Sequence, residues 1–264
     1  MMSSTGRNKG VLWATSGVAA IVVGLTVYVA VSGGAEEHGK TVGKGSGGFD
    51  SASASPSSPA QTYAPPEDWT EPKRWIALAR GERIDGQGNP VGFPHSTTGA
   101  VSMLAAANNT EYTANRSAAE EQIGIYRSYI AKVDQSAVKE ARVKLNGERT
   151  DRAMQSQLGY SGKMPQGAYV RGHIIGIKVL KEAKGEVTAW LLGRTTTKAG
   201  EAKKDSGAYT RTLGVARWEN GDWKIDAEAS VLALQAQGGD RPAMAAPGDS
   251  AFNSAGWTGM REAS

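Results

Sequence analysis

The side chains best suited to chemistry in this sequence are its three histidines, His38, His95 and His173. Histidine commonly acts as a general acid or base and as a metal ligand. The chain contains no cysteine, which excludes a thiol nucleophile, and its histidines fit neither the HExxH pattern nor another metal-ligand spacing. The sequence therefore predicts no catalytic residue, no metal site and no cofactor.

Two of these histidines still allow an alternative interpretation. His95 follows a Phe-Pro pair in a loop, and it can either hydrogen-bond the start of the next helix or approach the mouth of the fold as a base. His173 shares an expected strand face with Tyr169 and Arg171, where a polar surface position is the ordinary explanation. As a general base it would need an acidic partner, and none is visible in the sequence.

A glycine-rich loop and a group of basic residues are the other candidates for binding. The loop over 81–89 lacks the strand-loop-helix frame and the Lys-Ser/Thr pair of a phosphate loop, so a solvated loop is expected. The basic residues gather around an expected helix: Lys132, Lys139, Arg142, Lys144, Arg149 and Arg152. Acidic residues are interspersed and aromatic residues are missing, which favours a solvated face over a site for DNA or teichoic acid. No sequence-specific nucleic-acid binding is predicted.

An apolar stretch between Val11 and Val31 determines on which side of a membrane these residues lie. It contains about 21 uncharged residues, close to the roughly 20 that a helix needs to cross a bilayer. Arg7 and Lys9 precede it, which places the short N-terminus in the cytoplasm and the rest outside. A cleaved signal peptide is the alternative, but the apolar region is longer than is usual for one. The sequence predicts a single-pass protein of the cell membrane that contacts the lipid bilayer through this span.

Composition divides the remainder of the 264-residue chain, which carries a formal net charge of +4. Residues 1–10 form the cytoplasmic N-terminus, and residues 11–31 form the transmembrane helix. A linker rich in Gly, Ser and Pro follows over 32–66, because that segment has too few large apolar residues to fold. An extracytoplasmic α+β domain is expected over 67–237, and a flexible C-terminal tail over 238–264.

Helices are expected in the first part of the domain. One of the hydroxyl residues at 96–98 can cap a helix that runs over 99–113. A second helix starts at Ser117, where Ser-Ala-Ala-Glu has the spacing of a capping box. A third spans 136–145 and ends at Asn146-Gly147.

Strands are expected in the second part. Long β-branched and aromatic segments occupy 168–180, 186–197, 207–218 and 223–227. Short connections make the sheet antiparallel, and Asn220-Gly221 is suited to the positive φ angles of a hairpin turn. Glycines inside the strands are typical of a bent or bulged sheet. Together the segments predict an α+β fold in which a strongly curved antiparallel sheet wraps around the helices, with Trp190 and Trp218 buried in it.

This layout of an anchor, a low-complexity stalk, helices and a long curved meander resembles the membrane-anchored domains of the nuclear transport factor two-like class. Within that class it is similar to the VirB-type inner-membrane scaffold subunits of type IV secretion and to their Gram-positive counterpart, TcpC. The segment VGFPHSTTGAV over 91–101 also resembles the loop-to-helix entry of extracytoplasmic proteins from actinobacterial conjugative elements. The resemblance implies a cone-shaped domain, no chemistry, homo-oligomerisation, and contacts with other membrane or secretion-apparatus proteins.

Three functions are compatible with the sequence. The first is a non-enzymatic scaffold of a conjugative DNA-transfer or type IV secretion-like apparatus, as the resemblance implies. The second is an accessory protein of an envelope lipid-uptake complex, in which an anchor with a cone-shaped domain also occurs. The third is a ligand-binding or catalytic cone, in which His173 would be the base.

Overall fold

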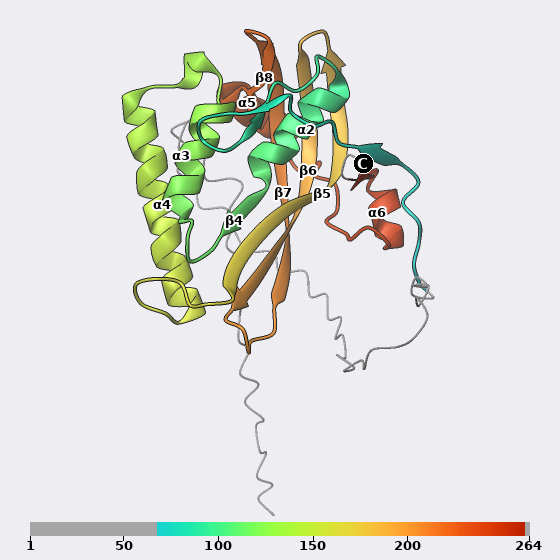
Figure 1. Ribbon diagram of the computed structural model, residues 1–264. Helices are drawn as coiled ribbons and strands as arrows, with labels where there is room; N and C mark the ends of the chain where they lie inside the picture. The colour runs from blue at the N-terminus through green and yellow to red at the C-terminus, as the bar shows by residue number, and fades with distance from the viewer. Residues whose placement is uncertain (1–67, 262–264) are drawn as a thin grey trace, which may run out of the picture.

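The computed structural model describes residues 68–261, which form an α+β domain around one large sheet (Figure 1). In chain order the elements are β1 (Trp75–Ala77), β2 (Arg83–Ile84), β3 (Pro90–Val91), α2 (Thr97–Asn108), β4 (Thr110–Tyr112), α3 (Ala118–Tyr129), the 3-10 helix η1 (Lys132–Asp134), α4 (Ala137–Leu158), β5 (Ala168–Ala183), β6 (Glu186–Ala199), β7 (Ser206–Glu219), β8 (Asp222–Ile225), α5 (Ala227–Ala236), α6 (Ser250–Ser254) and β9 (Thr258–Arg261). The predicted mixture of helices followed by strands is confirmed.

The stretch between Val11 and Val31 and the linker over 32–66 lie outside the described residues. In the part of the chain that the structure covers, no helix combines the length and the apolar character needed to cross a membrane. The membrane span, its orientation and the linker therefore stay predictions.

The sheet has seven strands, in the order β1-β9-β5-β6-β7-β8, with β4 paired to β5 beside this path. Strands β5 to β8 are antiparallel neighbours, as their short connections predict. Asn220 (φ 53°) and Gly221 (φ 83°) form the turn between β7 and β8, and both adopt the predicted positive φ. The register of β5 against β6 shifts twice, between Ile174 and Gly176 and between Val179 and Lys181. Such bulges bend a strand locally.

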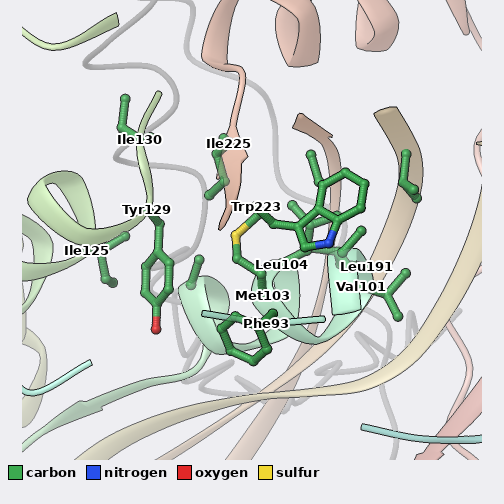
Figure 2. Packing of buried hydrophobic residues seen from close by; sticks show 14 of the residues in the cluster. Phe93, Val101, Met103, Leu104, Ile125, Tyr129, Ile130, Leu191, Trp223 and Ile225 are labelled. Atoms are coloured by element: carbon green, nitrogen blue, oxygen red, sulfur yellow. The ribbon is translucent and has the colours of Figure 1, made fainter. Parts of the chain in front are cut away.

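Helix α2 covers one face of the sheet, which we call the inner face. The Ser96 hydroxyl accepts a hydrogen bond from the Gly99 amide at 3.1 Å and so caps the helix, as predicted. Figure 2 shows the helix packed in the middle of an apolar cluster, which contains Phe93, Val101, Met103, Leu104, Leu191 and Trp223. Side chains therefore fill the space between α2 and the sheet.

Helix α2 ends earlier than the predicted range of 99–113. The helix stops at Asn108, and residues 110–112 form β4 against β5. The Asn109 side-chain oxygen accepts a hydrogen bond from the Ile174 amide at 2.9 Å, which ties the helix end to the sheet. Tyr112 has the spacing of the helix's apolar residues, but it belongs to a strand, because pairing with β5 provides hydrogen-bond partners for the backbone there. Its side chain is buried from that strand.

Helices α3 and α4 form a pair beside the sheet. The predicted capping box of Ser117 and Glu120 starts α3. The prediction that the third helix ends at Asn146-Gly147 is wrong, because α4 continues to Leu158 and stops at Gly159 (φ 70°). Gly147 is instead the contact point with α3: a Cβ atom there would lie 2.4 Å from the Ala119 Cα. Glycine allows the two backbones to touch.

The C-terminal segment covers the opposite, outer face of the sheet, so the predicted flexible tail over 238–264 is wrong for residues 250–261. Strand β9 pairs with β1 in parallel and with β5 antiparallel. Phe252 and Trp257 are buried in one cluster with Trp190 of β6. A Cβ atom at Gly176 would lie 3.0 Å from the Phe252 ring, so this glycine makes room for it. The segment is poor in large apolar residues, and two aromatic side chains provide most of its burial.

The two tryptophans predicted to be buried differ. Trp190 is 2% exposed in the outer cluster, which confirms the prediction. Trp218 is only partly buried, because it lies next to the β7–β8 turn and packs against Trp223 at the edge of the inner cluster. The prediction of a core position is therefore wrong for Trp218.

Candidate functional site

His95 lies in the loop between β3 and α2, where it stacks on an aromatic side chain. Its ring is 4.0 Å from the Trp218 ring, centroid to centroid and nearly parallel, and 5.6 Å from the Trp223 ring, which it meets edge to face. The helix cap that the sequence offered to His95 is provided by Ser96. His95 borders an open hollow of about 490 Å³, which is lined on its other side by the β5–β6 turn around Lys184. The ring thus covers the edge of the core.

His173 lies on the outer face of β5, opposite Arg194 of β6, and is exposed. Tyr169 and Arg171 share that face as predicted, and the Arg171 guanidinium lies 4.3 Å from the centre of the Tyr169 ring. The small cavity on the other side of the sheet at this point, lined by Asn108, Thr110 and Thr195, measures about 10 Å³, which is room for a single water molecule. That cavity is far below the 300–1,000 Å³ typical of a small-molecule site.

A buried polar cluster fills the inner side of the sheet below α2. Its members from β4 and α3 are Thr110, Tyr112, Glu121 and Gln122. Burial raises the pKa of the Tyr112 hydroxyl, which has no hydrogen-bond partner among the described residues. Burial also raises the pKa of Glu121, and the ion pair with Arg116 partly offsets this effect. Sequence analysis missed the cluster because β4 was read as helix.

The described residues contain no group of three His, Asp or Glu side chains that could hold a metal ion. The glycine-rich segment over 81–89 forms the β2–β3 hairpin. The Asp85 carboxylate accepts hydrogen bonds from the Gln87 and Asn89 amides, at 2.9 and 3.0 Å, and stabilises this turn. The segment is therefore a turn, as the sequence predicted.

The basic residues around α4 are mixed with acidic ones, as predicted. Lys139 pairs with Asp134, and Arg127 of α3 pairs with Glu140. The sequence did not reveal the apolar side chains that are exposed beside them. Val133, Val138 and Leu145 are 80%, 71% and 44% exposed. We call the surface formed by Val133, Val138, Ala141 and Leu145 the α4 outer face.

A second surface was also missed by sequence analysis. Cationic side chains share the outer face of the sheet at the end that α5 and α6 leave uncovered: Arg171, Arg194, Lys198 and Arg211. We call this surface, together with His173 and Tyr209, the outer basic face. Its members alternate along each strand, at 171 and 173, at 194 and 198, and at 209 and 211. Even spacing within the predicted strands was the signal that could have found them.

Comparisons with protein-family models, with curated proteins and with solved structures gave no match. The functional argument therefore depends on the residues of this chain. Two surfaces are the candidates for binding: the α4 outer face, with its exposed apolar side chains, and the outer basic face, where Arg194 and Lys198 have no ion-pair partner among the described residues.

Proposed function

We propose that this chain is a non-enzymatic, membrane-anchored extracytoplasmic scaffold subunit of a conjugative DNA-transfer or type IV secretion-like apparatus. We further propose that its domain is a nuclear transport factor two-like cone. The order of the helices α2, α3 and α4 before the antiparallel strands β5 to β8 supports the cone. The two bulges in β5 support it as well, because they bend the sheet.

The observation that carries the proposal is the contrast between the filled interior and the exposed surface of α4. Phe93, Met103 and Trp223 occupy the space in which a cone enzyme would hold its substrate (Figure 2). Helix α4 has 22 residues, of which Val143, Gly147 and Met154 are buried. A long helix that buries so little is suited to contacts with another protein, since its remaining surface is available.

The α4 outer face is the proposed contact with copies of this chain or with neighbouring subunits. Val138 and Leu145 lie seven residues apart and therefore project from the same side of the helix. Lys144 and Arg149 flank this apolar stripe and are exposed. An apolar centre with a charged rim is the usual composition of a protein–protein interface.

Two changes test whether the protein acts as a tethered scaffold. Deletion of residues 1–31 is expected to abolish transfer of the element that carries the gene, because a scaffold must stay at the membrane. His173→Ala is expected to leave transfer unchanged. An enzyme would show the reverse, since a lost general base typically costs about 10² or more in rate. Loss of transfer with His173→Ala at normal protein level would contradict the proposal.

A second experiment tests the α4 outer face. The double variant Val138→Asp and Leu145→Asp is expected to reduce chemical cross-linking of the full-length protein to itself and to its neighbours in native membranes. Leu232→Asp is the matched control, because Leu232 is 58% exposed on α5, away from α4. Equal cross-linking in all three proteins would exclude this face as the contact.

A further inference from the structure

The outer basic face is built from three adjacent strands in register. His173 of β5 lies opposite Arg194 of β6, which lies opposite Tyr209 of β7. Two residues further along, Arg171 lies opposite Thr196. Neighbours across the strands are about 5 Å apart, and successive residues on one face are about 7 Å apart along a strand. The cations therefore form a grid and not a single isolated charge.

Few carboxylates compensate these charges. Glu111 of β4 pairs with Arg171 at 2.7 Å. The Arg194 guanidinium extends over Gly207, where a Cβ atom would lie 3.5 Å from its Nε. No ion pair links Arg194 or Lys198 to another residue between 68 and 261. Because Gly207 has no side chain, it leaves room for the guanidinium against this strand.

Arg211 and the nearby Arg241 extend the positive surface toward the C-terminal segment. Arg211 donates to the Pro242 carbonyl and lies 5.9 Å from the centre of the Trp190 ring. Burial lowers the pKa of Arg211, and the nearby positive charge of Arg241 lowers it further. Two like charges held close together raise the local positive potential, and a bound anion would relieve their repulsion.

We propose that the outer basic face binds the phosphate backbone of single-stranded nucleic acid without reading its sequence. Arg194, Lys198 and Arg171 would contact phosphates, since guanidinium and ammonium groups provide most of the affinity in such sites. Tyr169 stacks under the Arg171 guanidinium, and Tyr209 lies opposite Arg194 and packs partly against the outer apolar cluster. Interleaved aromatic and basic side chains are typical of surfaces that bind single strands. The strand positions that form this face carry no Asn or Gln, the side chains that pair bidentately with adenine.

An anionic bilayer fits this surface less well. The β6–β7 turn over 200–205 lies at the same end of the sheet and would approach the bilayer first. It contains no aliphatic side chain larger than alanine, and its Lys203 and Lys204 are balanced by Glu201 and Asp205. Membrane-docking loops combine basic residues with apolar side chains that insert. The turn therefore favours a polymer that lies along the strands.

The test measures binding of a fluorescein-labelled 20-nucleotide oligothymidine to the full-length protein in detergent, by fluorescence anisotropy. Arg194→Glu with Lys198→Glu is expected to weaken binding about tenfold or more. The slope of log K against log salt should fall by about 1.4, which corresponds to two lost phosphate contacts on a single strand. Arg83→Glu with Lys184→Glu, at two exposed cations outside both surfaces, is the control with the same change in net charge, and it should alter Kd less than about twofold.

Three outcomes would overturn the inference. The first is an absence of oligothymidine binding by the unmodified protein at low salt. The second is an equal loss of affinity in the Arg83→Glu and Lys184→Glu control, which would indicate an effect of net charge alone. The third is that the protein binds phosphatidylglycerol vesicles through Arg194 and Lys198 and does not bind oligothymidine. If the variant with Arg194→Glu and Lys198→Glu does not fold, the variant with Arg194→Ala and Lys198→Ala replaces it. Circular dichroism confirms that the replacement is folded. The measurement needs no transfer apparatus, so its result is independent of the scaffold proposal.

Discussion

The two ends of the long strands β5, β6 and β7 have opposite roles. At the end nearer β8, the sheet is covered on its inner face by α2 and on its outer face by α5 and α6 (Figure 1). At the other end, no apolar cluster covers the outer face, and Arg171, Arg194 and Lys198 are its prominent side chains. Burial at one end holds the strands in register, and the other end can therefore carry charges at little cost in stability.

The interior changes along the same strands. Leu191 of β6 packs against α2, whereas Thr195, four residues further on, lines the small polar cavity. The cavity also contains Asn108 and Thr110, whose side-chain oxygens are buried without a protein partner. A water molecule in this cavity would provide partners for them. The apolar contacts at the covered end of the strands therefore determine the stability of the domain. The strands continue from there and position the side chains of the polar end.

Removal of the C-terminal segment that covers the outer face should lower the stability of the domain more than any other change considered. A chain that ends at Gln237 loses Phe252, Trp257 and strand β9. The free energy of unfolding should fall by at least about 5 kcal/mol, comparable to the whole stability of many domains. Chemical denaturation followed by tryptophan fluorescence measures it. The control is a chain that ends at Arg261, and similar unfolding midpoints for the two would show that the cover is dispensable.

A pair of substitutions on β6 compares the two ends directly. Trp190→Ala should cost about 3–5 kcal/mol of unfolding free energy, because it empties the outer cluster. Thr196→Ala, on the same face at the polar end, should change it by less than about 0.5 kcal/mol. Thermal unfolding by circular dichroism measures both. A loss at Thr196 as large as that at Trp190 would remove the distinction between the two ends.

Much of the fold could be predicted because its signals are local. The long strands, the Asn220-Gly221 turn and the Ser117 capping box each depend on neighbouring residues, and the structure confirms all three. The errors occurred where distant contacts decide. Gly147 reads as a helix stop until α3 is placed against it, and Trp257 reads as part of a tail until the sheet offers it a surface.

The candidate surfaces were predicted less well than the fold. The sequence indicates α4 as a candidate surface through its five basic residues and Lys132 before it, but the exposure of Val138 depends on α3 covering the other side of the helix. The outer basic face combines residues from three strands, so no single segment of the sequence shows an excess of charge. The sequence predicts His95 as a base or a helix cap, but not its stacking on Trp218. That contact joins two segments more than 100 residues apart, so no local pattern indicates it.

The smallest expected effect concerns the buried carboxyl group at the polar end. Burial raises the pKa of Glu121 above its ordinary value of 4.5, and Arg116 offsets part of this rise. The unfolded chain therefore releases this proton at a lower pH than the folded protein. As the pH rises from the unfolded-state pKa of Glu121 through its higher folded-state pKa, the free energy of unfolding decreases. Above the folded-state pKa this decrease is complete.

Glu121→Gln tests this sign, because glutamine is neutral at every pH. At pH 7 the variant should be more stable than the unmodified protein, because the burial cost of the charge is removed. Below about pH 3 the two should agree, since the glutamate is then protonated in both states. The ion pair with Arg116 detracts little from the gain, because the Arg116 side chain is 43% exposed. Urea unfolding at both pH values measures the difference, and a variant less stable at pH 7 would show that the ion pair outweighs the cost of burying the charge.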